Sequence, residues 1–318
     1  MSLQWWRSGT LGVPLIPGRP NWADPELKKV ICLFLPYMAG LSLNQVNPVI
    51  SRMVGSFLEG GTISALSYAD RVIQLPLGLF VIAISQAVLP LLSRLGPEET
   101  EAFARMTRDA LRFTLFVILP VVVGMSLLAR PMVHLLFVRG AFNEWAWSAT
   151  SRALALYVLG LPGMACSTVV MRGLYARRLP KEALKVTGIT VALNLFFCVT
   201  LVHLFSYAGL ALATSLAFTG GALMGTWSLR RHLKAPIEVL SGEWILRHGI
   251  PLFLMAAVIL AGSWLFPYDP ASRLLGKMLW VLIAVSAGAV VYGIASWLSG
   301  CDEWKWVSGA FRKEERFS

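Results

Sequence analysis

The chain has 318 residues, of which 56% are hydrophobic and 14% are charged. Soluble proteins carry about 25% charged residues, so this composition excludes a water-soluble globular protein and indicates a membrane protein. The formal charge of +11 comes from Lys and Arg residues that gather in short clusters between apolar stretches. Such clusters are typical of loops that face an anionic membrane leaflet, and their placement argues against a nucleic acid partner.

The N-terminal segment before Pro25 contains no continuous apolar run, because Pro14, Pro17 and Pro20 interrupt it. A cleavable signal peptide needs such a run. We therefore predict that no signal peptide is present and that the amino terminus stays in the cytoplasm.

Eight apolar stretches are long enough to cross a membrane, since a helix needs about 20 largely apolar residues to span the hydrocarbon core. They lie at residues 30–56, 64–93, 113–137, 147–173, 183–204, 207–229, 245–266 and 276–299. They lack the alternation of polar and apolar residues that barrel strands show, so we predict an all-α, polytopic membrane protein with eight transmembrane helices. Residues 97–112 mix acidic and basic side chains at helical spacing, which predicts an interfacial helix.

Cations alternate between the loops that connect these stretches. The connections around 94–112, 177–185 and 230–247 are rich in Lys and Arg, whereas those at 57–62 and 205–207 contain none. Cytoplasmic loops carry the excess of Lys and Arg, so the cation-rich connections should be cytoplasmic. An even number of spans then places both termini in the cytoplasm.

Proline and glycine mark departures from regular helices. Prolines occur within the first four stretches, at Pro36, Pro48, Pro76, Pro120 and Pro162. Each removes a backbone hydrogen bond and tends to bend its helix. Bent helices suit the cavity of a transporter, but membrane helices tolerate proline in general, and both interpretations stay open. Gly220, Gly221 and Gly225 predict close helix contact in the sixth stretch.

The second stretch carries a charged pair, Asp70 and Arg71, within its apolar sequence. Exposing either charge to lipid costs roughly 2.5 to 3.5 kcal/mol or more, so both should face protein or water. Ser67, Arg71 and Gln74 share one helix face at spacings of four and three. Two interpretations remain. The arginine either snorkels or pairs with another helix, or it lines a cavity for an anionic ligand.

The first stretch has a second polar face, formed by Asn44, Asn47 and Ser51 at spacings of three and four. Amides can bridge membrane helices, and they can also line a water-filled cavity. Two neighbouring spans with polar faces favour the cavity.

Motifs of catalysis and metal binding are absent from the sequence. It contains no His-Glu-x-x-His, no phosphate-binding glycine loop and no Gly-x-Ser-x-Gly, so we predict that the protein is not an enzyme. No two histidines lie four residues apart, as a helical metal pair requires. The cysteines have no short spacing and are interpreted as small hydrophobic residues, so we expect no disulfide framework, metal site or cofactor. They are Cys32, Cys166, Cys198 and Cys301.

Several short segments carry a family resemblance. They are Leu66–Arg71, Leu75–Gly78, Val88–Arg94, Arg139–Phe142, Gly173–Ala176 and Gly209–Ser215. In order and spacing, from about Gly12 through Pro236, the chain resembles the MurJ/MviN family of lipid II flippases, within the multidrug/oligosaccharidyl-lipid/polysaccharide exporter superfamily. The resemblance implies a carrier that moves the undecaprenyl-pyrophosphate-linked peptidoglycan precursor across the bacterial inner membrane by alternating access. Export of another polyprenyl-linked glycan or a drug, and an inactive or scaffolding membrane protein, remain alternatives.

The resemblance also implies a domain organisation. Family members have two six-helix lobes and two further helices that form a groove for the lipid tail. Residues 1–27 then form an interlobe-like segment, 28–231 the second lobe, 245–299 the two groove helices and 300–318 a basic cytoplasmic tail. The expected partners are the lipid precursor, membrane lipids and a separate or missing first lobe.

The resemblance finally implies roles for single residues. Arg71 matches the cavity arginine that meets the pyrophosphate and Asp70 its acidic neighbour, whereas Gln74 stands where an acidic residue is common. The substrate-binding residues implied are Arg71, Asp70, Gln74, Ser67, Asn44 and Asn47. Some family members bind sodium through positions that correspond here to Ser51, Asn194, Cys198, Leu210 and Thr214. Because Ser51 and Cys198 replace two carboxylates, we predict no tight sodium site.

Overall fold

The computed structural model describes residues 25–304 and residue 306. These residues form α-helices, one π-helical segment and their connections, and none of them forms a β-strand. The all-α prediction is confirmed for this part of the chain. Most of the predicted segment 1–27 and most of the predicted tail 300–318 lie outside the described residues.

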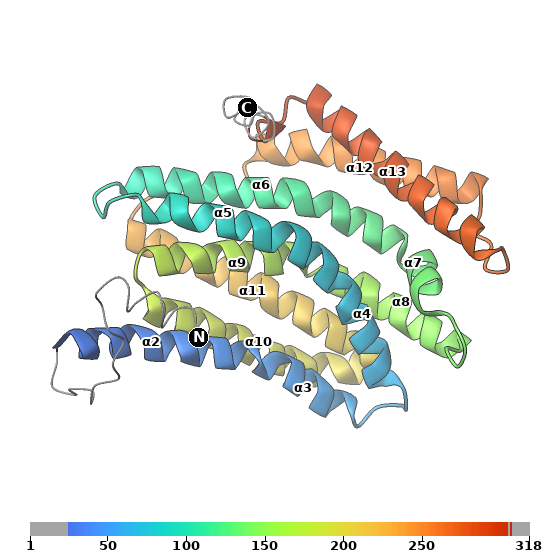
Figure 1. Ribbon diagram of the computed structural model, residues 1–318, viewed down its shortest axis with the longest axis horizontal. Helices are drawn as coiled ribbons and strands as arrows, with labels where there is room; N and C mark the ends of the chain where they lie inside the picture. Colours follow the sequence, from blue (N-terminus) through green and yellow to red (C-terminus); the bar gives the residue numbers. More distant parts are fainter. Residues whose placement is uncertain (1–24, 305, 307–318) are drawn as a thin grey trace, which may run out of the picture.

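All eight predicted apolar stretches are helical in the structure, and Figure 1 shows the helices running back and forth along one long direction. Their bounds are α2 (Pro25–Asn44), α3 (Val46–Gly55), α4 (Thr62–Pro76), η1 (Leu77–Val81), α5 (Ile82–Ser93), α6 (Thr100–Leu127), α7 (Ala129–Phe137), α8 (Glu144–Val158), α9 (Leu161–Ala176), α10 (Pro180–Phe205), α11 (Tyr207–Leu233), α12 (Gly242–Leu265) and α13 (Leu274–Leu298). Residues 97–112 are not a separate interfacial helix, because most of them form the first half of the 28-residue helix α6.

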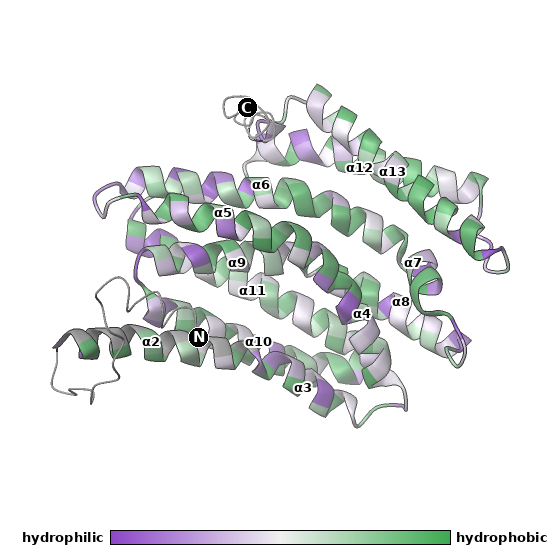
Figure 2. Ribbon diagram, in the orientation of Figure 1, coloured by the Kyte–Doolittle hydropathy of each residue, from purple (hydrophilic) through white to green (hydrophobic). Residues whose placement is uncertain are grey.

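Six helical segments of the described chain are long and apolar enough to cross a membrane, and the bent pair α8–α9 would make a seventh. The six are Thr62–Ser93, Thr100–Leu127, Pro180–Phe205, Tyr207–Leu233, Gly242–Leu265 and Leu274–Leu298. Figure 2 shows hydrophobic colour along most of their length. The structure therefore supports a multi-pass membrane protein, whereas the predicted number of eight spans is not confirmed. The first predicted stretch, 30–56, is divided at Gln45 into α2 and α3.

Packing divides the described chain into a bundle and a pair of helices beside it. Within the bundle, α11 packs against α8, α9 and α10, and α4 packs against α8. The pair α12 and α13 lies against α6 and α7, at the top of Figure 1. A small apolar cluster that includes Phe116, Met255 and Ile259 joins this pair to the bundle. There the Tyr292 hydroxyl donates a hydrogen bond to the Phe116 carbonyl oxygen at 2.9 Å.

Close approach of α11 to its neighbours depends on glycine. A Cβ atom at Gly221 would lie 2.2 Å from Thr190 of α10, and one at Gly225 would lie 2.9 Å from Val170 of α9. Distances below 3.0 Å are not compatible with ordinary atomic contact. The predicted close helix contact in the sixth stretch is therefore confirmed.

The helices of the bundle depart from regular α-helical geometry at two points. Pro76 has no backbone N–H to donate to the preceding turn, and after it the helix continues as the π-helical segment η1. Short π-helical segments are frequent at functional sites. Between α8 and α9 the chain bends by 43°. The last carbonyl groups of α8 have no partner within their own helix, and the Ser215 hydroxyl of α11 donates to one of them, Leu156, at 2.7 Å. A side chain from a third helix thus holds this bend.

Arginines join the loops at the cation-rich end, where the α5–α6, α9–α10 and α11–α12 connections lie together (Figure 1). Arg177 donates to the carbonyl oxygens of Gly96 and Pro97, each at 3.1 Å. Arg112 donates to the carbonyl oxygen of Val239 at 2.9 Å. The cationic side chains therefore order the ends of the helices as well as supplying charge.

Candidate functional site

A cavity of about 480 Å³ lies among α3, α4, η1, α8, α9 and α11. The helix α4 turns one face to the bundle core, where Ala69, Val72 and Ile73 are buried. The cavity-lining side chains of α4 include Ser67, Asp70, Arg71 and Gln74. Helical spacing of three and four residues brings three of these four onto one face.

Polar contacts within this face are short. The Gln74 amide nitrogen donates a hydrogen bond to the Asp70 carboxylate at 2.6 Å. The Arg71 guanidinium carbon lies 6.0 Å from the centre of the Tyr68 ring, at the limit of a cation–π contact. Gln74 therefore orients the carboxylate, whereas the arginine keeps its hydrogen-bond donors available to the cavity.

Arg71 and Arg52 are both exposed side chains that line the cavity. Within the described residues, neither guanidinium has an acidic oxygen within 4.0 Å. The half-buried Asp70 supplies the negative charge at this site, and Arg52 is the cation that acts on it. Two arginines against one aspartate leave the cavity positively charged. In the described part of the chain, Arg71 forms no ion pair with a residue of another helix. The structure therefore does not support the interpretation in which Arg71 pairs with another helix.

Asn47 of α3 adds an unsatisfied amide to the cavity. Its side chain is 4% exposed, and neither its amide nitrogen nor its amide oxygen has a hydrogen-bond partner among the described residues. An unpaired buried amide costs free energy, which a polar group of an occupant can recover. The site is therefore suited to a polar, anionic ligand. Asn44, predicted beside it, has a side chain outside the described part of the structure.

Two polar residues that line the cavity, Arg52 and Tyr157, were not among the predicted site residues. Arg52 follows Ser51 directly, and its charge inside the first apolar stretch was a usable signal. Tyr157, buried near the end of α8, lines the cavity opposite α4. Its hydroxyl group in the middle of an apolar stretch was a weaker signal, because tyrosine also packs in membrane cores.

The residues at the sodium-site positions lie together between α3, α10 and α11. The Asn194 amide nitrogen donates to the Thr214 hydroxyl at 3.3 Å, and that hydroxyl donates to the Leu210 carbonyl oxygen at 3.1 Å. The Cys198 thiol lies 3.7 Å from the Asn194 amide oxygen, and Ser51 interacts with the same thiol. This arrangement offers hydroxyl, amide and carbonyl oxygens but no carboxylate.

Sodium is expected to leave the purified chain unaffected at micromolar concentration, because a hard cation prefers oxygen ligands and charged ones most. Isothermal titration and thermal unfolding in sodium chloride, compared with choline chloride at equal ionic strength, measure this. The double variant Ser51→Asp with Cys198→Asp supplies both carboxylates and should gain sodium-dependent stability. A micromolar heat signal from the unmodified chain would contradict the prediction.

The sequence is similar to that of one family of membrane proteins along most of its length. A sequence model of the family described as "Lipid II flippase MurJ" matches residues 10–279. A probable lipid II flippase MurJ from Vibrio cholerae is 29% identical over 294 residues, which cover 90% of this chain and 54% of that protein. The corresponding protein of Haemophilus influenzae is 32% identical over 300 residues, covering 89% of this chain and 57% of its own length. The chain spans about half the length of these curated relatives.

Solved structures give the same relationship. A structure of lipid II flippase MurJ in an inward closed conformation matches with a TM-score of 0.69 and 28% identity, covering 89% of this chain and 56% of that one. An outward-facing multidrug resistance MATE family transporter shares only the fold, with a TM-score of 0.54 and 16% identity over 85% of this chain and 67% of that one. With the family model matching most of the sequence and the fold agreeing with it, the chain belongs to the MurJ family of lipid II flippases.

Proposed function

We propose that this chain forms the second half of a lipid II flippase, which carries the undecaprenyl-pyrophosphate-linked peptidoglycan precursor across the bacterial inner membrane. It acts as a transporter rather than as an enzyme. Eight spans, with α2–α3 and α8–α9 each counted as one, place both termini in the cytoplasm. The clustering of Lys and Arg at one end of the bundle supports this orientation.

Arg71 carries the proposal, because it lies in a positively charged cavity and has no acidic partner among the described residues. A diphosphate cannot cross hydrocarbon unaided, since moving charge out of water is costly. A guanidinium binds phosphate oxygens through two parallel hydrogen bonds, and Arg52 and the Asn47 amide add further donors beside it. Such a site lowers the barrier for the headgroup while the polyprenyl tail stays in lipid.

The two helical regions of the chain have different proposed functions. Residues 28–231 form the second lobe with the headgroup cavity, and residues 245–299 form a two-helix element that receives the lipid tail. Large exposed apolar side chains on α12 and α13, Phe253 and Ile283 among them, give this element a lipid-compatible surface. Alternating access requires a first lobe that rocks against this one, and the partner of this chain is therefore such a lobe.

A fusion protein tests the function. We expect this chain, joined to the first half of the Vibrio cholerae relative, to sustain growth of bacteria depleted of their own flippase. The intact relative is the positive control and its first half alone is the negative control. A fusion that inserts as well as the intact relative, but neither supports growth nor moves labelled lipid II in vesicles, would refute the proposal. Movement of a different polyprenyl-linked glycan would assign the alternative cargo.

A further inference from the structure

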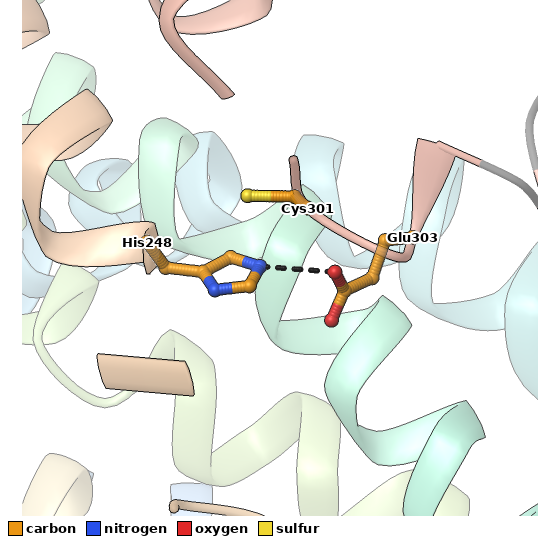
Figure 3. Close-up of side chains that lie close together, drawn as sticks. All are labelled: His248, Cys301 and Glu303. Carbon is orange, nitrogen blue, oxygen red and sulfur yellow. Dashed lines mark hydrogen bonds and ion pairs between the residues drawn. The ribbon is translucent and has the colours of Figure 1, made fainter. Parts of the chain in front are cut away.

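A second polar cluster lies outside the headgroup cavity, where the first turns of α12 meet the segment that follows α13. It consists of His248, Cys301 and Glu303, which are 2%, 4% and 5% exposed. Their nitrogen, sulfur and oxygen atoms all lie within 4.8 Å of one another. Figure 3 shows these side chains grouped together, with the imidazole directed at the carboxylate.

Hydrogen bonding defines the state of the imidazole. The Nδ1 atom of His248 lies 2.8 Å from the carbonyl oxygen of Trp244, which can only accept a hydrogen bond, so Nδ1 carries a proton. In the neutral ring, the Nε2 atom then presents a lone pair to the Glu303 carboxylate oxygen at 3.1 Å. Two lone-pair donors at this distance require a positive centre between them. Either a second proton or a metal ion fills that role.

The third group favours a metal ion. The Cys301 sulfur adds a soft donor to the nitrogen and the oxygen, and imidazole, thiolate and carboxylate are the ligands of protein zinc sites. Tetrahedral zinc holds its nitrogen and oxygen ligands roughly 3.4 Å apart, close to the observed spacing of the His248 and Glu303 atoms. The sulfur needs to approach by roughly 1 Å at most to complete three ligands.

The surroundings of the cluster match those of a metal centre. The His248 ring already holds the Nδ1 contact to a backbone carbonyl that fixes metal-binding histidines. The Trp244 indole nitrogen donates to the other Glu303 oxygen at 2.8 Å, which fixes the carboxylate. The rings of Trp244 and Phe116 pack against the imidazole, with ring centres 4.1 Å and 5.9 Å away. An adjoining cavity of about 290 Å³, lined by His248 and Glu303, leaves a fourth position open to water.

Charge balance agrees with this assignment. A dication bound by a thiolate and a carboxylate forms a neutral unit, which burial tolerates far better than an unpaired ion. Three arginines line the adjoining cavity. Arg108 pairs with Asp109 at 2.9 Å and Arg247 pairs with Glu243 at 2.5 Å, whereas Arg112 donates to the Val239 carbonyl oxygen at 2.9 Å.

We propose that His248, Cys301 and Glu303 bind one zinc-type divalent metal ion, which fastens the segment after α13 to the start of α12. The site lies at the cation-rich end of the bundle, apart from the headgroup cavity. His248 and Glu303 are 55 positions apart in the sequence, so the metal would connect the two ends of the α12–α13 hairpin.

Cobalt substitution tests the site directly. The full chain, purified in detergent without a polyhistidine tag and freed of metal, is titrated with Co²⁺. We expect one equivalent to produce tetrahedral visible bands and a thiolate-to-cobalt charge-transfer band, both abolished by one equivalent of Zn²⁺. Cys301→Ser should remove the charge-transfer band and weaken binding by more than about 100-fold, because even outer-shell changes cost about 10- to 100-fold. Cys166→Ser, at a cysteine in α9, is the matched control and should leave both bands intact.

A second measurement covers a Cys301 variant that does not fold. Zinc should protect Cys301 of the unmodified chain, but not Cys166, from alkylation detected by mass spectrometry of the labelled peptides. Zinc should also raise the midpoint of thermal unfolding, and a chelator should reverse the increase. The assignment is overturned if the unmodified chain gives no charge-transfer band, or if Cys301→Ser keeps it. A midpoint of thermal unfolding that changes with neither zinc nor chelator also overturns the assignment. His248 and Glu303 would then form an imidazolium–carboxylate pair without a metal ion.

Discussion

Arg71→Ala, introduced into the fusion protein that tests the function, is expected to abolish growth of the depleted strain. Removing a charge-assisted bidentate contact costs about 1.5 to 3 kcal/mol, so binding of the diphosphate lipid should weaken by about 10- to 100-fold. Arg71→Lys keeps the charge but loses the planar fork, and should retain part of the activity. Growth under depletion, together with binding of lipid II to the purified fusion, measures the effect.

The matched control for this variant is Arg105→Ala. Arg105 is an exposed arginine of α6 that does not line the headgroup cavity, so its removal changes the net charge equally without touching the site. Both variants should reach the membrane in equal amounts. Unchanged growth with Arg71→Ala, or equal loss with Arg105→Ala, would contradict the role assigned to Arg71.

Gly163→Ala is expected to destabilise the bundle strongly for a change of one methyl group. A Cβ atom at this position would lie 2.7 Å from the backbone Cα and nitrogen atoms of Thr219. Backbone atoms cannot rotate away, so α9 and α11 must separate, and overpacking of this kind costs about 1 to 3 kcal/mol. The midpoint of thermal unfolding of the purified chain in detergent should fall accordingly.

Gly188→Ala provides the comparison in the neighbouring helix α10. A Cβ atom there meets nothing within 4 Å. Alanine in a helix is favoured over glycine by about 0.5 to 1 kcal/mol, so this variant should be neutral or slightly more stable. Equal midpoints for the two variants would show that the α9–α11 contact is not as tight as the structure has it.

The helical architecture was predictable because hydrocarbon imposes a simple rule on sequence. Long apolar runs with cations between them predicted every helix-forming region, and the alternation of cations placed the loops at the two ends. The interruptions were harder to predict. Proline at position 76 indicated a bend, but the π-helical form of residues 77–81 and the 43° break between α8 and α9 depend on packing against other helices. Residues 97–112 were misassigned because amphipathic sequence does not distinguish an interfacial helix from an extension of α6.

The headgroup cavity was partly predictable for a similar reason. Ser67, Asp70, Arg71 and Gln74 are neighbours in sequence, so local spacing alone groups them on α4. Tyr157 and Thr214 join them only through the packing of α8 and α11 against α4. The His248–Cys301–Glu303 cluster was missed, because His248 is separated from the other two residues by most of two helices. Motif spacing carries no signal at that range. The interpretation of the cysteines as small hydrophobic residues rested on their spacing in the sequence, which gives no information about such distant neighbours.

The bend between α8 and α9 is held at a fixed angle by contacts with α11. The Ser215 hydroxyl donates to the Leu156 carbonyl oxygen, and a Cβ atom at Gly160 would lie 2.6 Å from the Cα atom of Ser215, so α11 packs tightly against the bend. In the proposed transport cycle, changes in the shape of the cavity are then expected at the interruption at Gln45 and at the π-helical segment after Pro76, where the regular helix is already broken. Tyr157 would then keep its position, while α3 and α4, which carry Arg52 and Arg71, move relative to it.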